Sequence, residues 1–171
     1  MEAASVKKKE IVPTQYGLAA AVAKHVDLVR VHANALSARM IAPHRTVVEA
    51  MAKNEVETKL SWSPTFDVQE VPSALIIRIP FAVAIAPREA QAALVEVQVE
   101  FVLEYSLDSL PPNDMRPDLF EAFAKVNGVY NAWPYLREVV QNTIARMAIP
   151  PVVLPVYRVP KPKVGMDDTS K

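Results

Sequence analysis

The chain has 171 residues with 19 basic and 19 acidic side chains, so its formal net charge is zero, and it contains 3 glycines, 15 prolines and no cysteine. A neutral chain has no overall attraction to nucleic acid or to an anionic membrane, and a chain without cysteine forms no disulfide and no thiolate zinc site. Gly17, Gly128 and Gly165 lie too far apart for a phosphate-binding loop, a dinucleotide fold or a nucleophile elbow.

The length suits a single domain with a sizeable core. We expect a disordered N-terminus over residues 1–13, one domain over residues 14–157, and a basic, proline-rich, disordered tail over residues 158–171. The start of the chain is charged and no apolar segment follows it, so we expect no signal peptide. The densest apolar run, residues 79–86, is shorter than the roughly 18 residues of a membrane span. These features predict a cytoplasmic protein without membrane insertion.

The domain is predicted to begin with a short helix and a strand. Thr14 can cap a helix that runs to Val26. Small and aliphatic residues then alternate with polar ones, as in a half-buried strand: Val29, Val31, Ala33 and Ala35. Leu36 breaks this alternation and predicts a bulge next to Ala35. Residues 43–54 are predicted to be a long connection that contains an apolar cluster.

Three further strands are predicted. The second covers residues 55–69, in which Pro64 predicts an edge position or a break. The third covers residues 74–85, is apolar or small on both faces, and loses pairing at Pro80, which has no N–H to donate. The fourth covers residues 95–105 and has one apolar face. Its other face carries three carboxylates, Glu96, Glu100 and Glu104.

Two helices are predicted after the strands. The first begins near Pro117 and ends at Asn127-Gly128. The second covers residues 129–147, with Pro134 at a kink or restart, and has a narrow apolar stripe. The stripe consists of Trp133, Leu136, Val140, Ile144 and Met147. Strands followed by helices predict an α+β fold, with a four-stranded antiparallel sheet covered on one face by the C-terminal helices.

The residues that could support catalysis do not form a recognisable site. His25, His32 and His44 fit no metal motif, and no serine has the glycine neighbours of a nucleophile elbow. Carboxylates at i and i+4 on a strand are roughly 13 Å apart, too far for an acid–base pair from this strand alone. We therefore expect no catalytic, cofactor or metal site. The acidic strand face is either solvated or a docking surface for a basic partner.

Apolar side chains are in surplus. The helices carry Phe120, Phe123, Tyr130, Trp133 and Tyr135, which belong to the core by default. One sheet and two helices nevertheless offer more apolar surface than one protomer can bury. The surplus predicts an oligomer interface or a groove for apolar ligands.

The segment WPYLREVVQNTIARMAIPPVVLP, residues 133–155, resembles the corresponding helix and tail of the SecB export-chaperone family. The matching positions are Trp133, Pro134, Tyr135, Arg137, Glu138, Arg146, Pro150 and Leu154. The strand order agrees with the family's protomer, the segment VRVHANALSA resembles its first strand, and the likeness covers residues 26–156.

The resemblance implies an ATP-independent holdase that binds unfolded polypeptides, assembled as a homotetramer from two dimers. Client contacts would come from the groove between the sheet, the 43–54 connection and the helices: Val47, Val48, Met51, Phe120, Phe123, Tyr130 and Trp133. In the family an acidic sheet surface docks the SecA motor, and here its candidates are Leu94, Glu96 and Glu100. Ala35 and Arg39 occupy positions where the family has carboxylates, so only the fourth-strand part of this acidic docking surface is retained.

Other departures point to a divergent member. A basic, proline-rich tail replaces the family's C-terminal helix and acidic tail, and an extra helix precedes the first strand. These features resemble the SecB-like chaperones that accompany toxin–antitoxin pairs. The leading hypothesis is a SecB-like holdase, and the alternative is a dedicated chaperone of an antitoxin. A small-molecule enzyme with its site between sheet and helices is the third hypothesis.

Overall fold

A computed structural model of the chain describes residues 14–70, 73–89, 92–107 and 115–157. The segments predicted to be disordered, 1–13 and 158–171, lie outside the described residues. In chain order the elements are α1 (Gln15–Ala23), β1 (Val26–Met40), α2 (His44–Ala52), β2 (Val56–Trp62), β3 (Thr65–Glu70), β4 (Ser73–Pro87), β5 (Val95–Leu107), α3 (Pro117–Phe123), the π-helical turn η2 (Ala124–Gly128) and α4 (Val129–Arg146).

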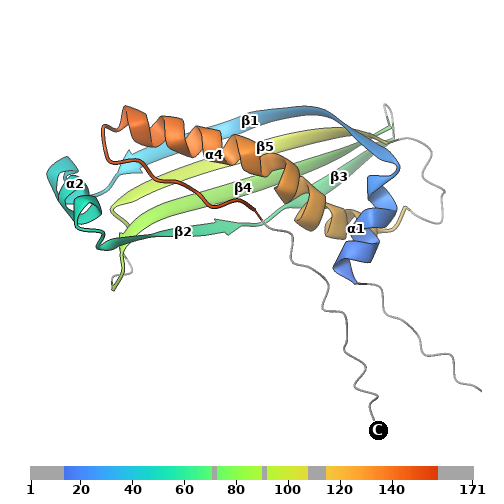
Figure 1. The fold of residues 1–171 in the computed structure, drawn as a ribbon. Helices are drawn as coiled ribbons and strands as arrows, with labels where there is room; N and C mark the ends of the chain where they lie inside the picture. The colour runs from blue at the N-terminus through green and yellow to red at the C-terminus, as the bar shows by residue number, and fades with distance from the viewer. Residues whose placement is uncertain (1–13, 71–72, 90–91, 108–114, 158–171) are drawn as a thin grey trace, which may run out of the picture.

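The predicted α+β architecture is confirmed. The strands form one antiparallel sheet in the order β1-β5-β4-β2, and β3 also pairs with β4. The helix α4 lies across one face of this sheet, α1 packs beside α3 at one end, and α2 lies at the opposite end (Figure 1). Thr14 caps α1 as predicted, since its hydroxyl oxygen accepts a hydrogen bond from the Gly17 N–H at 3.3 Å.

The sheet has five strands in place of the four predicted, because the expected second strand is divided at Pro64 into β2 and β3. Trp62 is paired with Phe81 and Thr65 with Arg78, so the two intervening residues of β4 face the break. One of these two residues is Pro80. Pro80, which has no N–H to donate, therefore lies where the neighbouring strand is interrupted. A continuous neighbouring strand would have a carbonyl oxygen without a donor at this point, and the break avoids this.

The bulge in β1 lies earlier than predicted. The register shifts between Ala33 and Ala35 and again between Leu28 and Arg30. The extra residue reverses the alternation, so Ala35 is paired with Glu100 on the polar face while Leu36 is paired with Val99 on the apolar face. The sequence alternation predicted Ala35 to be on the apolar face, which is wrong.

Residues 43–54, predicted to be a long connection with an apolar cluster, are mostly helical. Val47 and Met51 are separated by one helical turn, and Val47 is fully buried in the core while Met51 is half-buried. Arg45 and Glu49, also one turn apart, form an ion pair of 2.7 Å on the exposed side. The cluster is short and follows a proline, which is why its helical spacing is easily overlooked.

The helical path continues through Gly128, where the sequence predicted a stop. The backbone there is right-handed helical, with φ −57° and ψ −53°, and the turn η2 joins α3 to α4 without a break. A Cβ on Gly128 would lie 3.2 Å from the Ile77 side chain and 3.5 Å from that of Ile79. Glycine is therefore present for close approach of the helix to the sheet, and it does not end the helix.

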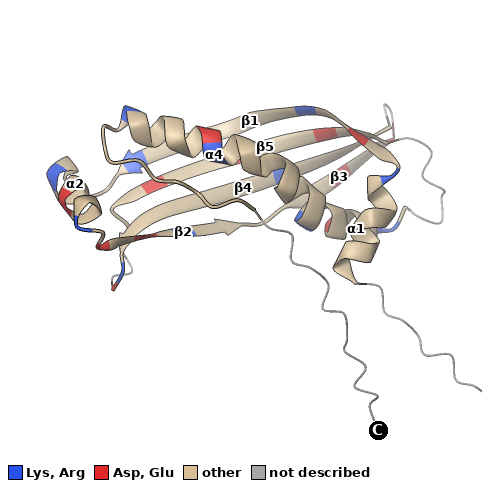
Figure 2. Cartoon of the chain, viewed as in Figure 1, with Lys and Arg blue, Asp and Glu red and all other residues tan. Residues whose placement is uncertain are grey.

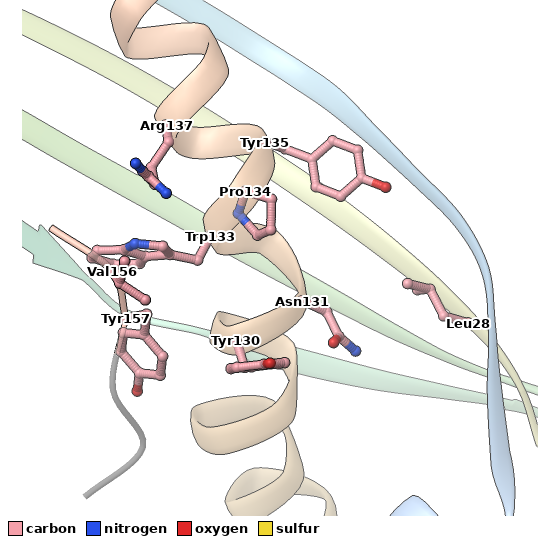
Figure 3. A pocket seen from close by; sticks show the side chains of 9 residues that line it. All are labelled: Leu28, Tyr130, Asn131, Trp133, Pro134, Tyr135, Arg137, Val156 and Tyr157. Carbon is pink, nitrogen blue, oxygen red and sulfur yellow. The ribbon is translucent and has the colours of Figure 1, made fainter. Parts of the chain in front are cut away.

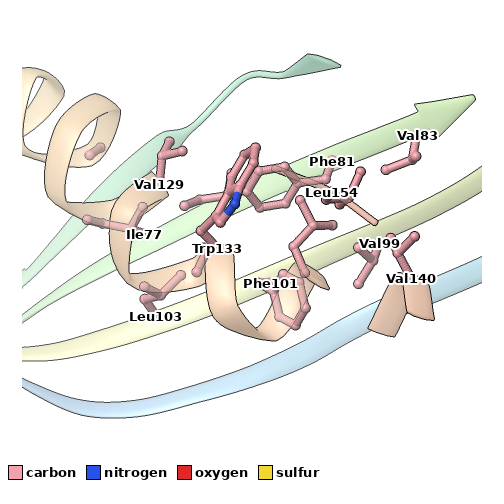
Figure 4. Packing of buried hydrophobic residues seen from close by; sticks show 14 of the residues in the cluster. Ile77, Phe81, Val83, Val99, Phe101, Leu103, Val129, Trp133, Val140 and Leu154 are labelled. Atoms are coloured by element: carbon pink, nitrogen blue, oxygen red, sulfur yellow. The ribbon is translucent and has the colours of Figure 1, made fainter. Parts of the chain in front are cut away.

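The core lies between α4 and the inner faces of β4 and β5 (Figure 4). Of the predicted stripe on α4, Trp133, Leu136, Val140 and Ile144 are buried, and Met147 is half-buried. From the sheet, alternate residues of both central strands point to the same layer. These are Leu75, Ile77, Ile79, Phe81, Val83 and Ile85 of β4, and Val95, Val97, Val99, Phe101, Leu103 and Tyr105 of β5.

Substitution of Leu136 by alanine should test this packing. Leu136 has 0% exposure in the middle of the stripe, and removing a buried leucine side chain costs about 2–5 kcal/mol of unfolding free energy. The exposed Gln141 on the same helix is the matched control, and Gln141→Ala should change stability by less than about 0.5 kcal/mol. Urea unfolding followed by circular dichroism measures both, and equal stabilities would contradict the assigned core.

Candidate functional site

A groove of about 380 Å³ crosses the outer surface of α4. It passes over Pro134, with Leu28 of β1 on one side and Val156 and Tyr157 of the C-terminal segment on the other (Figure 3). We call it the α4 groove. Its lining residues are Leu28, Tyr130, Asn131, Trp133, Pro134, Tyr135, Arg137, Val156 and Tyr157.

Trp133 and Tyr157, which line the groove, belong to an aromatic cluster that reaches the sheet. The ring centroid of Trp133 lies 5.8 Å from that of Trp62, 6.4 Å from that of Phe81 and 5.0 Å from that of Tyr157. The first two contacts are edge-to-face, which the ring quadrupoles favour. Trp133 is only 6% exposed, whereas Trp62 is 38% exposed. The cluster therefore joins the core to the surface at this point.

The C-terminal segment, residues 148–157, folds back along α4 and forms one wall of the groove (Figures 1 and 3). Leu154 is 2% exposed and anchors the segment in the core. The indole N–H of Trp133 donates a hydrogen bond of 2.8 Å to the carbonyl oxygen of Pro155. Residues 154–157 are thus held by α4, and the predicted tail over residues 158–171 lies outside the described residues.

Two tyrosines give the groove its exposed apolar surface. Tyr130 is 55% exposed and Tyr135 is 41% exposed. They flank Pro134, which lies inside α4 and cannot donate the helical hydrogen bond to the Tyr130 carbonyl oxygen. The Tyr135 ring also contacts Phe101 at 6.3 Å between centroids, which limits its freedom. Large exposed rings on a rigid helix are suited to contact with another apolar surface.

Arg137 is the one charged side chain among the residues that line the groove. Its Nε atom is buried, and within the described part of the chain it has no hydrogen-bond partner. The arginines on the sheet and on α2 differ, since Arg39 and Arg45 each donate to a glutamate of this chain.

The predicted client residues lie at three different places. Phe120 and Phe123 are buried on α3, where Phe120 contacts Phe66 and Phe123 contacts Tyr105. Val47, Val48 and Met51 lie on α2 at the opposite end of the sheet, where Val47 is buried and the other two are half-buried. Tyr130 and Trp133 lie together in the α4 groove. The structure therefore brings together two of the seven predicted residues.

The groove also contains residues that the sequence did not single out. Leu28, Val156 and Tyr157 come from segments distant in the chain, and only the fold brings them to α4. Tyr135 was assigned to the core by default, although it lies two residues from Trp133 and so points away from the buried stripe. That spacing was the available signal. From the sequence, Arg137 is notable only as one of the positions that match the SecB-family helix segment.

The acidic face of the sheet is engaged with residues of the same chain. Glu96 forms an ion pair of 2.7 Å with Arg39, and Glu100 accepts a hydrogen bond of 2.6 Å from Asn34. Leu94 is half-buried, and its backbone is hydrogen-bonded to Ile41 and Ile85. The charged residues of β5 are all acidic, and Arg30 and Arg39 lie on the neighbouring strand β1 (Figure 2). The docking candidates thus lie on one face, but their charges are largely balanced.

No group of three or more histidine, aspartate or glutamate residues that could hold a metal occurs in the described ranges. His44 lies near the C-terminal end of α4, where its Nε2 atom is 3.1 Å from the Ala148 carbonyl oxygen. None of the helices that the structure describes is long and apolar enough to cross a membrane.

The fold is that of the SecB-like chaperones. The chain superposes on the Mycobacterium tuberculosis SecB-like chaperone Rv1957, solved in complex with a ChAD peptide from the antitoxin HigA1 (Rv1956), with a TM-score of 0.69 and 21% sequence identity. The match covers 84% of this chain and 99% of that one, and it confirms the fold that the helix segment predicted.

A Streptococcus agalactiae protein of unknown function matches 76% of this chain and 96% of its own, with a TM-score of 0.36 and 12% identity, too weak a likeness for any argument. No family model and no curated protein sequence matches the chain.

Tyr105, beneath the groove, should make stability depend on alkaline pH. Burial raises the pKa of Tyr105 from 10.0 to about 12, although the hydrogen bond from the Asn131 amide to its hydroxyl acts in the opposite direction. Between these values the unfolded chain loses the phenolic proton and the folded chain keeps it. Stability is therefore intact below pH 10 and falls above it, by about 1.4 kcal/mol per pH unit from this group.

The measurement is urea unfolding at several pH values from 9 to 12, for the natural chain and for Tyr105→Phe. Other groups titrate in this range, and the difference between the two slopes isolates Tyr105. The phenylalanine variant should lose stability less steeply, and parallel slopes would contradict the assignment.

Proposed function

We propose that the protein is an ATP-independent holdase that binds apolar segments of unfolded polypeptides in the α4 groove. The observation that carries the proposal is an open, aromatic-lined groove on the outer face of a helix in a SecB-like fold. Tyr130 and Tyr135 offer exposed rings there, and Trp133, whose ring contacts Trp62, also lines the groove. The proposal assigns no catalytic step to the protein.

Contact energy in such a groove is sufficient for capture without a nucleotide. An aromatic client side chain buries about 150–250 Å², which at roughly 25 cal/mol per Å² corresponds to about 4–6 kcal/mol before the cost of ordering the client. Burial of apolar surface is non-directional, so many sequences fit. Exposed apolar segments mark unfolded chains, and a groove of this kind selects them. We place this activity in the cytoplasm, where new chains are still unfolded.

A second candidate function is that of a dedicated antitoxin chaperone. The observation that favours it is the structural neighbour Rv1957, which was solved with a peptide from an antitoxin. The groove would then receive one preferred segment in place of many. The reading frames beside the gene test this candidate: a small toxin–antitoxin pair supports it, and a group of secretion genes supports general export.

Docking to a SecA-like motor is less favoured by the sheet face. A basic partner requires free carboxylates, and here Glu96 is paired with Arg39 while Glu104 lies 3.8 Å from Arg30. A partner would have to displace these cations. Substituting Arg39 by glutamine would free Glu96, and a gain in SecA binding would show which groups limit docking.

We also propose that the protein acts as a homotetramer. β1 is a 15-residue edge strand, paired on one side only, with β5. Leu28 and Leu36 are paired with Tyr105 and Val99, whose side chains are buried on the helical side of the sheet, but remain 42% and 53% exposed because α4 packs mainly against β4 and β5. A long exposed edge with apolar neighbours favours association.

Substitution of either exposed tyrosine should weaken client binding. Tyr130→Ser and Tyr135→Ser each remove a ring from the groove, and we expect about tenfold less capacity to suppress aggregation of a denatured client. Light scattering of the client at several chaperone ratios measures this effect. Ile41→Ser is the matched control, since Ile41 is 49% exposed and lies outside the groove.

All three variants should unfold within about 1 kcal/mol of the natural chain, since the replaced side chains are exposed. Native mass spectrometry checks that their assembly is unchanged. If the unsubstituted protein fails to suppress aggregation at a few-fold molar excess, the holdase proposal is wrong.

The assembly should appear in native mass spectrometry as a species four times the 18.9 kDa mass of the chain. Leu36→Lys should shift the population to smaller species, because a charged side chain on the apolar side of the edge strand opposes association. Thr65→Lys adds the same charge on exposed β3 and should leave the tetramer intact. A monomer of the natural chain at micromolar concentration would overturn the proposal.

A further inference from the structure

The C-terminal segment lies beside α4 and over the sheet in the way an extended peptide lies in a binding site (Figures 1 and 4). Leu154 is buried in the core cluster, and the carbonyl oxygen of Pro155 accepts the 2.8 Å hydrogen bond from the Trp133 indole. The ring centroid of Tyr157 lies 5.0 Å from that of Trp133 and 6.2 Å from that of Trp62. One aliphatic side chain, one carbonyl group and one aromatic ring therefore fix the last four residues of the segment.

The main chain of this segment takes no part in the sheet. Pro150, Pro151 and Pro155 have no N–H to donate. Residues 149–157 form no backbone–backbone hydrogen bond with any residue that the structure describes. The segment leaves α4 through Ala148, whose φ of 55° lies in the left-handed region that glycine normally occupies at a helix end. Since side chains hold the segment, it can leave its place without breaking a strand or a helix.

Packing around the segment is incomplete. A hollow of about 270 Å³ has α4 on one side and the segment on the other. Its lining residues are Gln141, Ala145, Ile149, Pro151, Val152 and Val153. Val153 and Val156 are 69% and 68% exposed, so two apolar side chains of the segment contribute little to the fold. Protein cores are normally close-packed, and this loose contact therefore indicates an occupant that can be exchanged.

We propose that the C-terminal segment occupies a polypeptide-binding site of its own chain, and that a client segment of the same chemistry displaces it. This inference rests on the proposed holdase function and adds the class of client segment that fits. The preferred client has an aliphatic residue followed three positions later by an aromatic one, as Leu154 is followed by Tyr157. Any residue between them supplies a carbonyl oxygen for the Trp133 N–H. The exchange replaces each contact with a similar one, so the core stays covered.

An internal occupant makes binding selective. A tethered segment competes at an effective concentration of millimolar order, and a client binds only to the fraction of molecules in which the site is open. A folded protein with few exposed apolar segments is therefore rejected, whereas an unfolded chain that offers many segments succeeds. When the client leaves, the segment again covers Trp133, which keeps the chaperone's own apolar surface from aggregating.

Thiol labelling tests the displacement directly, because the chain has no cysteine of its own. In the full-length variant Leu154→Cys the thiol is shielded while the segment is in place, since Leu154 is 2% exposed. A ten-residue peptide with the sequence of residues 148–157 should raise the rate of thiol modification about tenfold. Leu103→Cys is the matched control, because Leu103 is 0% exposed on β5, outside the segment, and its rate should not change.

A second peptide, with aspartate in place of its leucine, should leave both labelling rates unchanged. Fluorescence anisotropy with labelled peptides shows whether each one binds. If the first peptide binds without changing the labelling rate of Leu154→Cys, the segment is a fixed part of the fold and this inference is overturned, while the holdase proposal stands. If neither peptide binds and the natural chain does not suppress aggregation, both proposals fail.

Weakening the segment should strengthen peptide binding. Tyr157→Ala removes the aromatic contact of the segment, and the affinity for the first peptide should rise about tenfold because the internal competitor is weaker. Val153→Ala, at an exposed residue of the same segment, should leave the affinity unchanged. Thermal unfolding and native mass spectrometry check the fold and the assembly of both variants. Equal or weaker binding by Tyr157→Ala would contradict displacement, and a change in its assembly would overturn the inference by showing that the segment is a contact between subunits.

Discussion

The structure depends on the burial of one stripe of α4 against the inner faces of β4 and β5. Leu136, Val140 and Ile144 are buried in one core cluster with alternate residues of the two strands. The absence of a side chain at Gly128 brings the start of the helix within contact distance of Ile77. Because a helix buries only one face on a single sheet, this arrangement leaves Tyr130 and Tyr135 on the opposite face of α4 exposed among the described residues.

That uncovered face is the basis of the proposed activity. Exposed aromatic rings on a mobile loop would cost conformational entropy on each binding event, whereas Tyr130 and Tyr135 are carried on a helix that the core holds in place. Trp133 connects the two sides, since its ring is packed in the core while its N–H fixes the C-terminal wall of the groove. The stability of the fold and the shape of the groove are therefore coupled through one residue.

Much of the fold could be predicted from periodicity, because β5 and α4 are long and each buries a single face. The errors occurred where tertiary contacts decided the outcome. Gly128 has the local signature of a helix end, yet its close approach to the sheet keeps it inside a helix. The bulge before Ala35 depends on the pairing with β5. The helix α2 is short, and burial of Val47 in the core supports it more than local propensity does.

The candidate site was less predictable than the fold, for a different reason. Sequence patterns rank residues by hydrophobicity, and a hydrophobic residue in the core looks the same as one in a groove. Phe123 and Tyr130 were equivalent candidates until the helix phase placed one inside and the other outside. Arg137 shows the converse, since a charged residue is assigned to solvent by default. Only the packing around it shows a buried nitrogen, which has no acceptor among the described residues, and no sequence pattern reveals such an environment.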